Sequence, residues 1–280
     1  MFEWATTFAG WDRCFQYGSV LVLVSIDRAA VTFDLWNTLI FEFDNKLNSR
    51  KRRELRTEYS LDALRGLGES LEWVKFHETF GDLADEITAG HDGGTDAHFH
   101  KWVELGLSLI DPDLPHRLGG SGITHVGDAI DKAFLDCPPL LLEGSLEILN
   151  QVHSRGLMIG LITNTGMTSS GAFTAWFAEL GLLPVFDHMV FSNDLAIAKP
   201  NHLIFDVTLE ALGVIPRRVI HVGDNIHTDV AGAAAAGITT VWVSGSAQTD
   251  LTFAVKPDFT LQTILELLPI VDRWLESLDR

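Results

Sequence analysis

Short runs of apolar residues recur along the second half of the chain, separated by stretches in which apolar residues return every three or four positions. The short runs are typical of buried strands, and the spaced positions are typical of one face of a helix. The strands are expected at 30–36, 157–163, 185–191, 218–222 and 238–243 and near Phe259. The helices between them are expected at 144–154, 170–181, 201–212, 228–236 and 261–278. Strands that alternate with helices predict a parallel sheet with helices on both faces.

Residues 45–137 show no strand pattern and interrupt this alternation. Helices are expected there at 48–65, at 71–90, from a cap at Thr95 or Asp96 to about 110, and, after a Gly-rich loop at 119–122, at 125–136. Just before them, residues 39–44 alternate apolar and acidic side chains, which predicts a short hairpin or flap. The sequence therefore predicts an α/β fold. Residues 1–44 and 138–280 are expected to form a Rossmann-like, three-layer parallel-sheet core. Residues 45–137, the helical insert, are expected to be all-helical.

The N-terminal residues contain one apolar run, at 18–26, that resembles the core of a short signal peptide. Acidic residues precede it, and Asp27-Arg28 follows without a small-residue cleavage site, so an apolar strand or extension is favoured. The two cysteines, Cys14 and Cys137, have no metal or redox spacing, which fits a reducing cytoplasm. No apolar run approaches the length of a membrane span.

The net negative charge of the chain makes some classes of binding partner unfavourable. Its 280 residues carry a formal net charge of −18. An acidic surface argues against nucleic acid and anionic membranes as partners. A small phosphorylated molecule remains compatible, because a few local cations can bind it. The sequence gives no indication of the oligomeric state.

Asp34 lies inside the first apolar strand of the predicted core. A carboxylate in such a strand is costly unless another group pairs with it or a reaction uses it. The strand then ends at Asn37-Thr38, which are turn residues. Because ligands of open α/β sheets bind at strand ends, Asp34 is a candidate nucleophile.

Three later segments also place polar residues at or after strand ends. Thr163-Asn164 offers a hydroxyl and an amide that suit an oxyanion. Lys199, before Pro200, is a cation that can face a phosphate. Asp224 follows Gly223, which allows a tight turn, and together with Asp229 it can hold a hard cation.

These pieces, in this order and spacing, resemble the haloacid dehalogenase superfamily. The resemblance covers roughly 30–44 and 138–245 and includes the position of the helical insert, which corresponds to a cap after the first strand. Most members of that superfamily are magnesium-dependent phosphatases. The resemblance therefore implies magnesium-dependent hydrolysis of a small phosphorylated metabolite, with the cap closing over the site.

The resemblance also implies roles for individual residues. Asp34 would attack phosphorus and form an aspartyl-phosphate, held in place by a turn that Thr38 braces. Thr163, with Asn164 beside it, would bind the transferring phosphoryl oxygens, and Lys199 would offset their charge.

The metal ligands follow from the same resemblance. Mg²⁺ would be held by Asp34, Asp224 and the backbone carbonyl of Trp36, and Asp229 would ligate the ion or orient Asp224. As an alternative, Asp229 caps the helix that follows it.

Trp36 departs from the pattern, because family phosphatases carry a second Asp there as general acid. Losing such a group costs on the order of 10²–10⁴ in rate. Three explanations remain open: a substrate with a good leaving group such as an acyl phosphate, another proton donor from the cap, or a different reaction. The last includes a metal-independent 2-haloacid dehalogenase, although Asp224 and Asp229 would then repel Asp34 without a cation. Besides a phosphatase and a dehalogenase, the third class of protein that the sequence allows is a binding protein with a degenerate site.

Three further groups of residues have both a structural and a functional interpretation. The basic block at 50–53 either recruits an anionic substrate or forms a solvated helix face, and the solvated face is favoured. His91, Asp92, Asp96, His98 and His100 match no metal-ligand spacing, so a loop and helix cap is favoured. The aromatic residues that either shape a substrate pocket or pack in the core are Phe41, Phe43, Trp73 and Trp102.

Overall fold

The computed structural model describes residues 13–17, 20–24, 28–42, 47–246 and 255–278. Its centre is a six-stranded sheet in which every neighbouring pair runs parallel, in the order β10-β9-β8-β3-β6-β7. The strands are β3 (Ala30–Phe33), β6 (Met158–Thr163), β7 (His188–Phe191), β8 (Val219–Gly223), β9 (Thr239–Val243) and β10 (Phe259–Leu261). The predicted parallel sheet is therefore confirmed.

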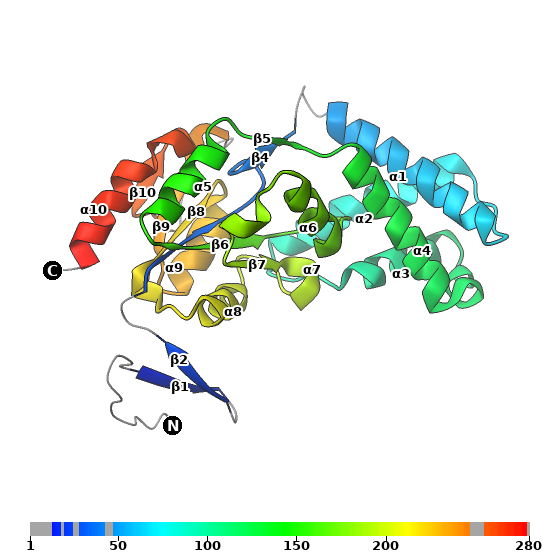
Figure 1. Cartoon of the computed structure of the whole chain (residues 1–280). Coiled ribbons are helices and arrows are strands. Elements are labelled where there is room, and N and C mark those ends of the chain that lie inside the picture. The colour runs from blue at the N-terminus through cyan, green and yellow to red at the C-terminus, as the bar shows by residue number, and fades with distance from the viewer. Residues whose placement is uncertain (1–12, 18–19, 25–27, 43–46, 247–254, 279–280) are drawn as a thin grey trace.

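Helices cover both faces of this sheet, which gives the predicted three layers (Figure 1). One face packs on α5 (Ser145–Ser154), α6 (Ser170–Glu179) and α10 (Leu268–Leu278), and the other on α8 (His202–Leu212) and the short α9 (Gly232–Ala235). Successive residues of β6 face opposite layers, since Leu161 belongs to the first core cluster and Ile162 to the second.

The position of β3 decides where the site forms. Phe33 is in register with Leu161 of β6 on one side and with Val222 of β8 on the other. The carboxyl ends of these three central strands therefore lie side by side at one edge of the sheet, which is where open α/β sheets bind ligands.

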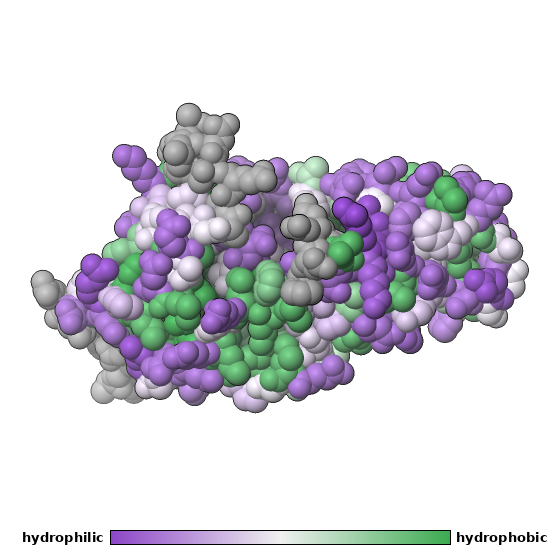
Figure 2. Space-filling model, turned by 90° about the horizontal axis from the view of Figure 1, so that it is seen from above, coloured by the Kyte–Doolittle hydropathy of each residue, from purple (hydrophilic) through white to green (hydrophobic). Residues whose placement is uncertain are grey.

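The described part of the helical insert consists of four α-helices. They are α1 (Leu47–Gly66), α2 (Trp73–His91), α3 (Phe99–Ile110) and α4 (Leu114–Asp136). They lie beside one end of the core in Figure 1, and their apolar faces meet in a core cluster of their own, to which the sheet core contributes Met167. Figure 2 shows that much of the visible surface of the insert is hydrophilic, as expected for helices that bury one face.

Two predictions inside the insert were wrong. The expected loop at 119–122 is reduced to a kink at Gly119 (φ 63°, ψ 179°), and α4 begins at Leu114. Buried Leu114, Ile123 and Val126 anchor both sides of the kink, so packing overrides the weak helix propensity of the glycines. The third helix begins at Phe99, and its N-cap is His98, which makes no side-chain cap bond.

The core and the insert are joined by a short antiparallel pair. Ile40–Phe41 (β4) pairs with Leu140–Leu141 (β5). Of the hairpin or flap expected at 39–44, the local hairpin is therefore wrong, because β4 has a distant partner. Residues 43 and 44 of that stretch, and the expected boundary at 44/45, lie outside the described residues.

Several element bounds also differ from the sequence-based expectation. Strand β3 ends at Phe33, before a turn that brings Trp36 to an isolated bridge with Ile40. The expected helix at 228–236 is a π-helical segment, Ile226–Ala231, followed by α9. A 3₁₀ turn at Ile264–Glu266 precedes α10.

The N-terminal residues form a separate two-stranded antiparallel sheet, β1 (Arg13–Tyr17) and β2 (Val20–Val24). Strand β2 confirms the expected strand within 18–26. None of the helices in the described ranges has both the length and the apolar character needed to cross a membrane.

Candidate active site

The turn after β3 holds Asp34 at the edge of the sheet. Its backbone N–H donates to Val222 O (2.8 Å), and its side chain is buried. The chain then folds back, with the N–H groups of Leu39 and Ile40 donating to Leu35 O. Asn37 adopts φ 56°, a left-handed conformation that Asn tolerates better than most residues. The Thr38 hydroxyl, which is fully buried, donates to Asp34 Oδ2 (3.3 Å).

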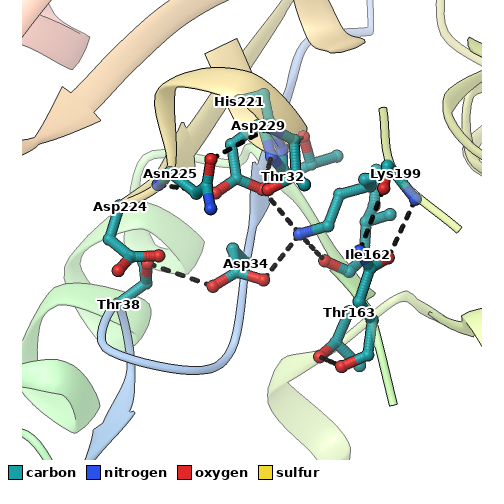
Figure 3. A network of polar contacts seen from close by, with 12 residues as sticks. Thr32, Asp34, Thr38, Ile162, Thr163, Lys199, His221, Asp224, Asn225 and Asp229 are labelled. Carbon is teal, nitrogen blue, oxygen red and sulfur yellow. Dashed lines mark hydrogen bonds and ion pairs between the residues drawn. The ribbon is translucent and has the colours of Figure 1, made fainter. Parts of the chain in front are cut away.

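Lys199 lies between two carboxylates, as Figure 3 shows. Its Nζ is 2.5 Å from Asp34 Oδ1 and 2.6 Å from Asp229 Oδ1, and it also donates to Ile162 O (2.7 Å). All three ammonium donors are thus used inside the protein. Because Lys199 is 1% exposed, its charge acts with little screening by water.

Asn164 fixes the backbone of Lys199. Its side-chain Nδ2 donates to Lys199 O (3.0 Å), and its Oδ1 accepts from Lys199 N (2.8 Å). This two-bond clamp joins the end of β6 to the segment before α8. The Asn164 amide, expected to bind phosphoryl oxygens, is therefore occupied in positioning Lys199.

The end of β8 requires glycine because Asp229 lies against it. A Cβ on Gly223 would be 2.3 Å from Asp229 Cγ, far inside van der Waals contact. Asp229 Oδ2 accepts from Asn225 N (3.0 Å), and Asn225 caps the following segment by accepting from His227 N and Thr228 N. Asn225 thus performs the capping considered for Asp229, whose carboxylate faces Lys199 instead.

Three carboxylates meet at this point. One oxygen each from Asp34, Asp224 and Asp229 lies within 4.8 Å of the others, and among the described residues this is the group with a metal-ligand arrangement. Among the described acids, Lys199 forms ion pairs with Asp34 and Asp229, so a single ammonium lies beside three acidic groups.

The pKa values of the three acids reflect this imbalance. Burial raises the pKa of Asp34 to about 7, although Lys199 opposes the rise. Burial and the charge of Asp229 raise the pKa of Asp224 to about 6, against a hydrogen bond from Asn37. For Asp229, burial is outweighed by Lys199 and His221, which lower its pKa. The cluster therefore holds more negative charge than its surroundings neutralise.

A hard divalent cation fits this arrangement. Mg²⁺ is commonly bound through a few carboxylates, with the remaining positions open to water or phosphate. Asp224 and the Oδ2 side of Asp34, which accepts from the Thr38 hydroxyl, lie away from Lys199 in Figure 3.

A cavity of about 470 Å³ opens over the carboxylates and is closed on one side by the helical insert. Core residues that line it include Asp34, Trp36, Asn164 and Lys199, and helices α1 and α2 add Arg52, Arg53, Arg56, Thr88 and His91. Its size is that of a site for a small molecule.

Of the two other predicted site residues, Trp36 lies at the cavity and Thr163 does not. Trp36 lines the cavity and contacts the Phe173 ring edge-on. The Thr163 hydroxyl is fully buried and donates to Asn164 O (3.3 Å), and Thr163 is outside the cavity lining.

The acidic and histidine residues at 91–100 act as a structural junction. Asp96 accepts from Ser192 Oγ (2.5 Å) and Trp102 Nε1 (2.7 Å) and contacts His91 Nε2 (3.2 Å). Ser192 begins α7 (Ser192–Leu195), so Asp96 ties the insert to the core.

Among the aromatic pocket candidates, Trp73 is 41% exposed and stacks on His77, and Trp102 packs at the edge of the insert's core cluster. Phe41 is outside the cavity lining, and Phe43 lies outside the described residues. The described aromatic rings that line the cavity are those of Trp36 and Phe173.

Sequence reasoning missed two supporting residues and one cavity cation. Thr32 Oγ1 lies 2.9 Å from His221 Nδ1, and His221 Nε2 lies 3.4 Å from Asp229 Oδ1, so a buried polar chain supports Asp229. Arg56 lines the cavity one turn after the basic block. Its spacing from Arg52 and Arg53 on one helix was the available signal.

Comparisons with known proteins match both the sequence and the fold. The family model of a haloacid dehalogenase-like hydrolase matches residues 29–237. The glyceraldehyde 3-phosphate phosphatase of Methanothermobacter thermautotrophicus is 33% identical over 217 residues, covering 77% of this chain and 85% of the relative. The pyrimidine 5'-nucleotidase of Escherichia coli is 32% identical over 144 residues, and this match spans 49% of the chain and 61% of that enzyme.

A solved structure shows the same fold along nearly the whole described chain. The 2-haloacid dehalogenase of Pseudomonas syringae pv. tomato superposes with a TM-score of 0.61 at 20% identity, covering 88% of this chain and 99% of the other. At this identity the likeness concerns the fold alone.

Proposed function

The chain belongs to the haloacid dehalogenase-like hydrolases, and we propose that it is a magnesium-dependent phosphatase that transfers the phosphoryl group of a small metabolite to Asp34. The observation that carries this proposal is the group formed by Asp34, Asp224 and Asp229, in which Lys199 contacts two of the three carboxylates. The names of two relatives, a phosphatase and a 5'-nucleotidase, support it.

Asp34 is the proposed nucleophile. Lys199 and Thr38 each hold one of its oxygens, which fixes the carboxylate toward the cavity. Attack on phosphorus forms an aspartyl-phosphate and expels the alkoxide or carboxylate of the leaving group. Water then attacks phosphorus, which releases phosphate and restores the carboxylate.

The positive charge beside Asp34 is proposed to stabilise the transition state of phosphoryl transfer. Lys199 offsets charge on the phosphoryl oxygens, and its clamp to Asn164 holds it in place. Backbone N–H groups of the turn after β6 are proposed to bind the phosphoryl oxygens. The Thr163 hydroxyl, which donates to Asn164 O in the structure, would have to turn from that bond to join them. When bound, Mg²⁺ would be held by Asp34, Asp224, the Trp36 carbonyl and Asp229, and would neutralise charge developing on the phosphoryl group.

Residues 45–137 are proposed to be a separate cap domain over a core formed by residues 1–44 and 138–280. Their helices have their own core cluster and wall one side of the cavity. A cap in this position excludes water and contacts the leaving group.

The experiment that tests this function measures phosphate release from p-nitrophenyl phosphate and acetyl phosphate, each with Mg²⁺ and with EDTA. Both leaving groups depart without a general acid, so neither needs the Asp that Trp36 replaces. We expect release with Mg²⁺ that stops in EDTA. Release from neither substrate under either condition would reject the proposed function.

Trp36 supports one second candidate, a metal-independent 2-haloacid dehalogenase. A halide leaves unprotonated, so a tryptophan at this position costs that reaction nothing. Chloride release from 2-chloropropionate in EDTA, in the absence of phosphatase activity, would establish this alternative.

A further inference from the structure

Helix α1 presents three arginines to the cavity, and two of them are already engaged. Arg52 is buried, and it donates from Nε to Cys137 O (2.7 Å) and from Nη1 to Glu42 Oε1 (2.6 Å). Arg53 lies 3.6 Å from Asp85 Oδ1 at the cavity rim. These two guanidinium groups therefore have protein partners.

Arg56 has no such partner within the described part of the chain. Its Nε is buried without a hydrogen bond, and its guanidinium forms no ion pair with a described residue. Asp131 is the acid that attracts it, but the Asp131 oxygens accept from the N–H and hydroxyl of Ser169. Arg56 is partly buried overall. A buried guanidinium nitrogen without a hydrogen-bond partner is unfavourable unless a ligand supplies an acceptor.

Three arginines converge at this wall, and two of them have acidic partners. Burial and the nearby Arg52 and Arg53 lower the pKa of Arg56 to about 10, so it remains protonated at neutral pH. Asp85 and Asp92 also line the cavity, but they are exposed, and Asp85 faces Arg53. An anion beside Arg56 would pair with its guanidinium and oppose the effect of Arg52 and Arg53 on its pKa.

This site is distinct from that of the reacting group. Asp34 and Lys199 come from the core, whereas Arg56 comes from the helical insert, and both line the same cavity of about 470 Å³. A molecule that places its phosphoryl group at Asp34 can therefore present its other end to Arg56.

We propose that Arg56 binds a second anionic group of the substrate, a carboxylate or a second phosphate on the leaving-group side. This inference rests on the proposed phosphatase function. The planar guanidinium offers two parallel donors to either oxyanion. The substrate class is thus a small phosphorylated acid or a bisphosphate, and Arg56 determines specificity without touching the reacting atoms.

The test uses p-nitrophenyl phosphate hydrolysis by the full chain with Mg²⁺, inhibited by competitors. The competitors are 2-phosphoglycolate, with a carboxylate, fructose 1,6-bisphosphate, with a second phosphate, and glycerol 1-phosphate, with neither. In the wild type, at least one of the first two is expected to inhibit about 10–100-fold more tightly than glycerol 1-phosphate. The competitor that inhibits more tightly identifies the second anionic group as a carboxylate or a phosphate.

Arg56→Gln is expected to abolish this preference while hydrolysis of p-nitrophenyl phosphate, which lacks a second anion, stays within about twofold. Arg65→Gln is the matched control, because Arg65 lies on the same helix, is exposed and pairs with Asp62; it should keep the preference. Arg56→Lys keeps the positive charge but loses the planar pair of donors, so this variant should show a reduced preference. It also tests the inference if Arg56→Gln does not fold.

A wild type that binds all three competitors equally, or a preference that survives in both Arg56 variants, would overturn the inference. Absence of p-nitrophenyl phosphate hydrolysis in the wild type would instead reject the proposed function. The two failures are therefore distinguishable.

Discussion

At Asp34, one ammonium group serves two buried carboxylates. Lys199 lies within 2.6 Å of both Asp34 and Asp229, and Asp224 adds a third negative charge. Because the surplus charge is buried, it favours either a proton or a cation on the cluster. Replacing single carboxylates should reveal whether the cluster binds a proton or a cation.

Asp34→Asn is expected to lower turnover of p-nitrophenyl phosphate at least about 10⁴-fold, since an amide is a poor nucleophile and forms no aspartyl-phosphate. Steady-state kinetics would measure this, with circular dichroism to show that the variant is folded. A variant with full turnover would exclude Asp34 as the nucleophile.

Asp224 is expected to make the stability of the metal-free protein depend on pH. Its pKa in the folded state, about 6, lies above its unfolded value, so the folded form binds the proton more tightly. Without metal, stability is then lost as pH rises from about 4 through 6. Asp224→Asn should therefore stabilise the metal-free protein by about 1–3 kcal/mol at about pH 7.5, and by much less at about pH 4.5.

Thermal denaturation in EDTA at both pH values would measure this difference. Mg²⁺ should then raise the melting temperature of the wild type at the higher pH but leave Asp224→Asn nearly unchanged. An equal stability difference at the two pH values would contradict the assignment of the pH dependence to Asp224.

The chemical types of the site residues were visible in the sequence, whereas their partners were not. Asp34, Lys199, Asp224 and Asp229 each follow or interrupt an apolar strand, which marks them for the sheet edge. The clamp between Asn164 and Lys199 joins residues far apart in the chain, so no local pattern could indicate it.

At the scale of elements, the end of β8 shows how a strand and the following segment fix the acid cluster. Gly223 has no side chain, and this lets the Asp229 carboxylate lie against the strand and reach Lys199. The requirement is for close approach, since Gly223 has no positive φ.

Gly223→Ala is expected to displace the Asp229 carboxylate, because the new Cβ would be 2.3 Å from its Cγ. The expected costs are about 1–3 kcal/mol of stability and about 100-fold in turnover. Gly120→Ala is the control. Gly120 lies in α4 with nothing within 4 Å of the new Cβ, and this change should stabilise by about 0.5–1 kcal/mol. Similar effects of the two changes, in melting temperature and kcat, would contradict the close-contact explanation.

Local signals located most elements but failed where packing decides. The glycines at 119–122 predicted a loop, yet α4 passes through them because apolar residues on both sides pack against neighbouring helices. The β4–β5 pairing depends on the insert returning to its starting point, and this is a property of the tertiary fold.

For the whole molecule, the helical insert and the core meet at the cavity. Strands β4 and β5 bring the two ends of the insert together, and the insert packs mainly in its own core cluster. The order of helices and strands predicted this organisation, but the cavity between the two parts required the three-dimensional arrangement. Arg56 was missed for the same reason.

Replacing residues 45–137 by a short Gly/Ser linker is expected to leave a folded α/β core, because the ends of β4 and β5 are already adjacent. The shortened protein should unfold cooperatively and keep a stabilisation by Mg²⁺. It should lose turnover, since the cavity would lose one wall and admit water. Far-ultraviolet circular dichroism with thermal denaturation would check this; a chain without cooperative unfolding would contradict the proposed cap domain.

The most direct test of the central claim is rapid-quench mass spectrometry of the peptide that contains Asp34 during turnover of p-nitrophenyl phosphate. We expect the mass of one added phosphoryl group on Asp34 with Mg²⁺, and none in EDTA or in Asp34→Asn. Release of phosphate without a phosphorylated Asp34 peptide, or with the group on another residue, would contradict the account.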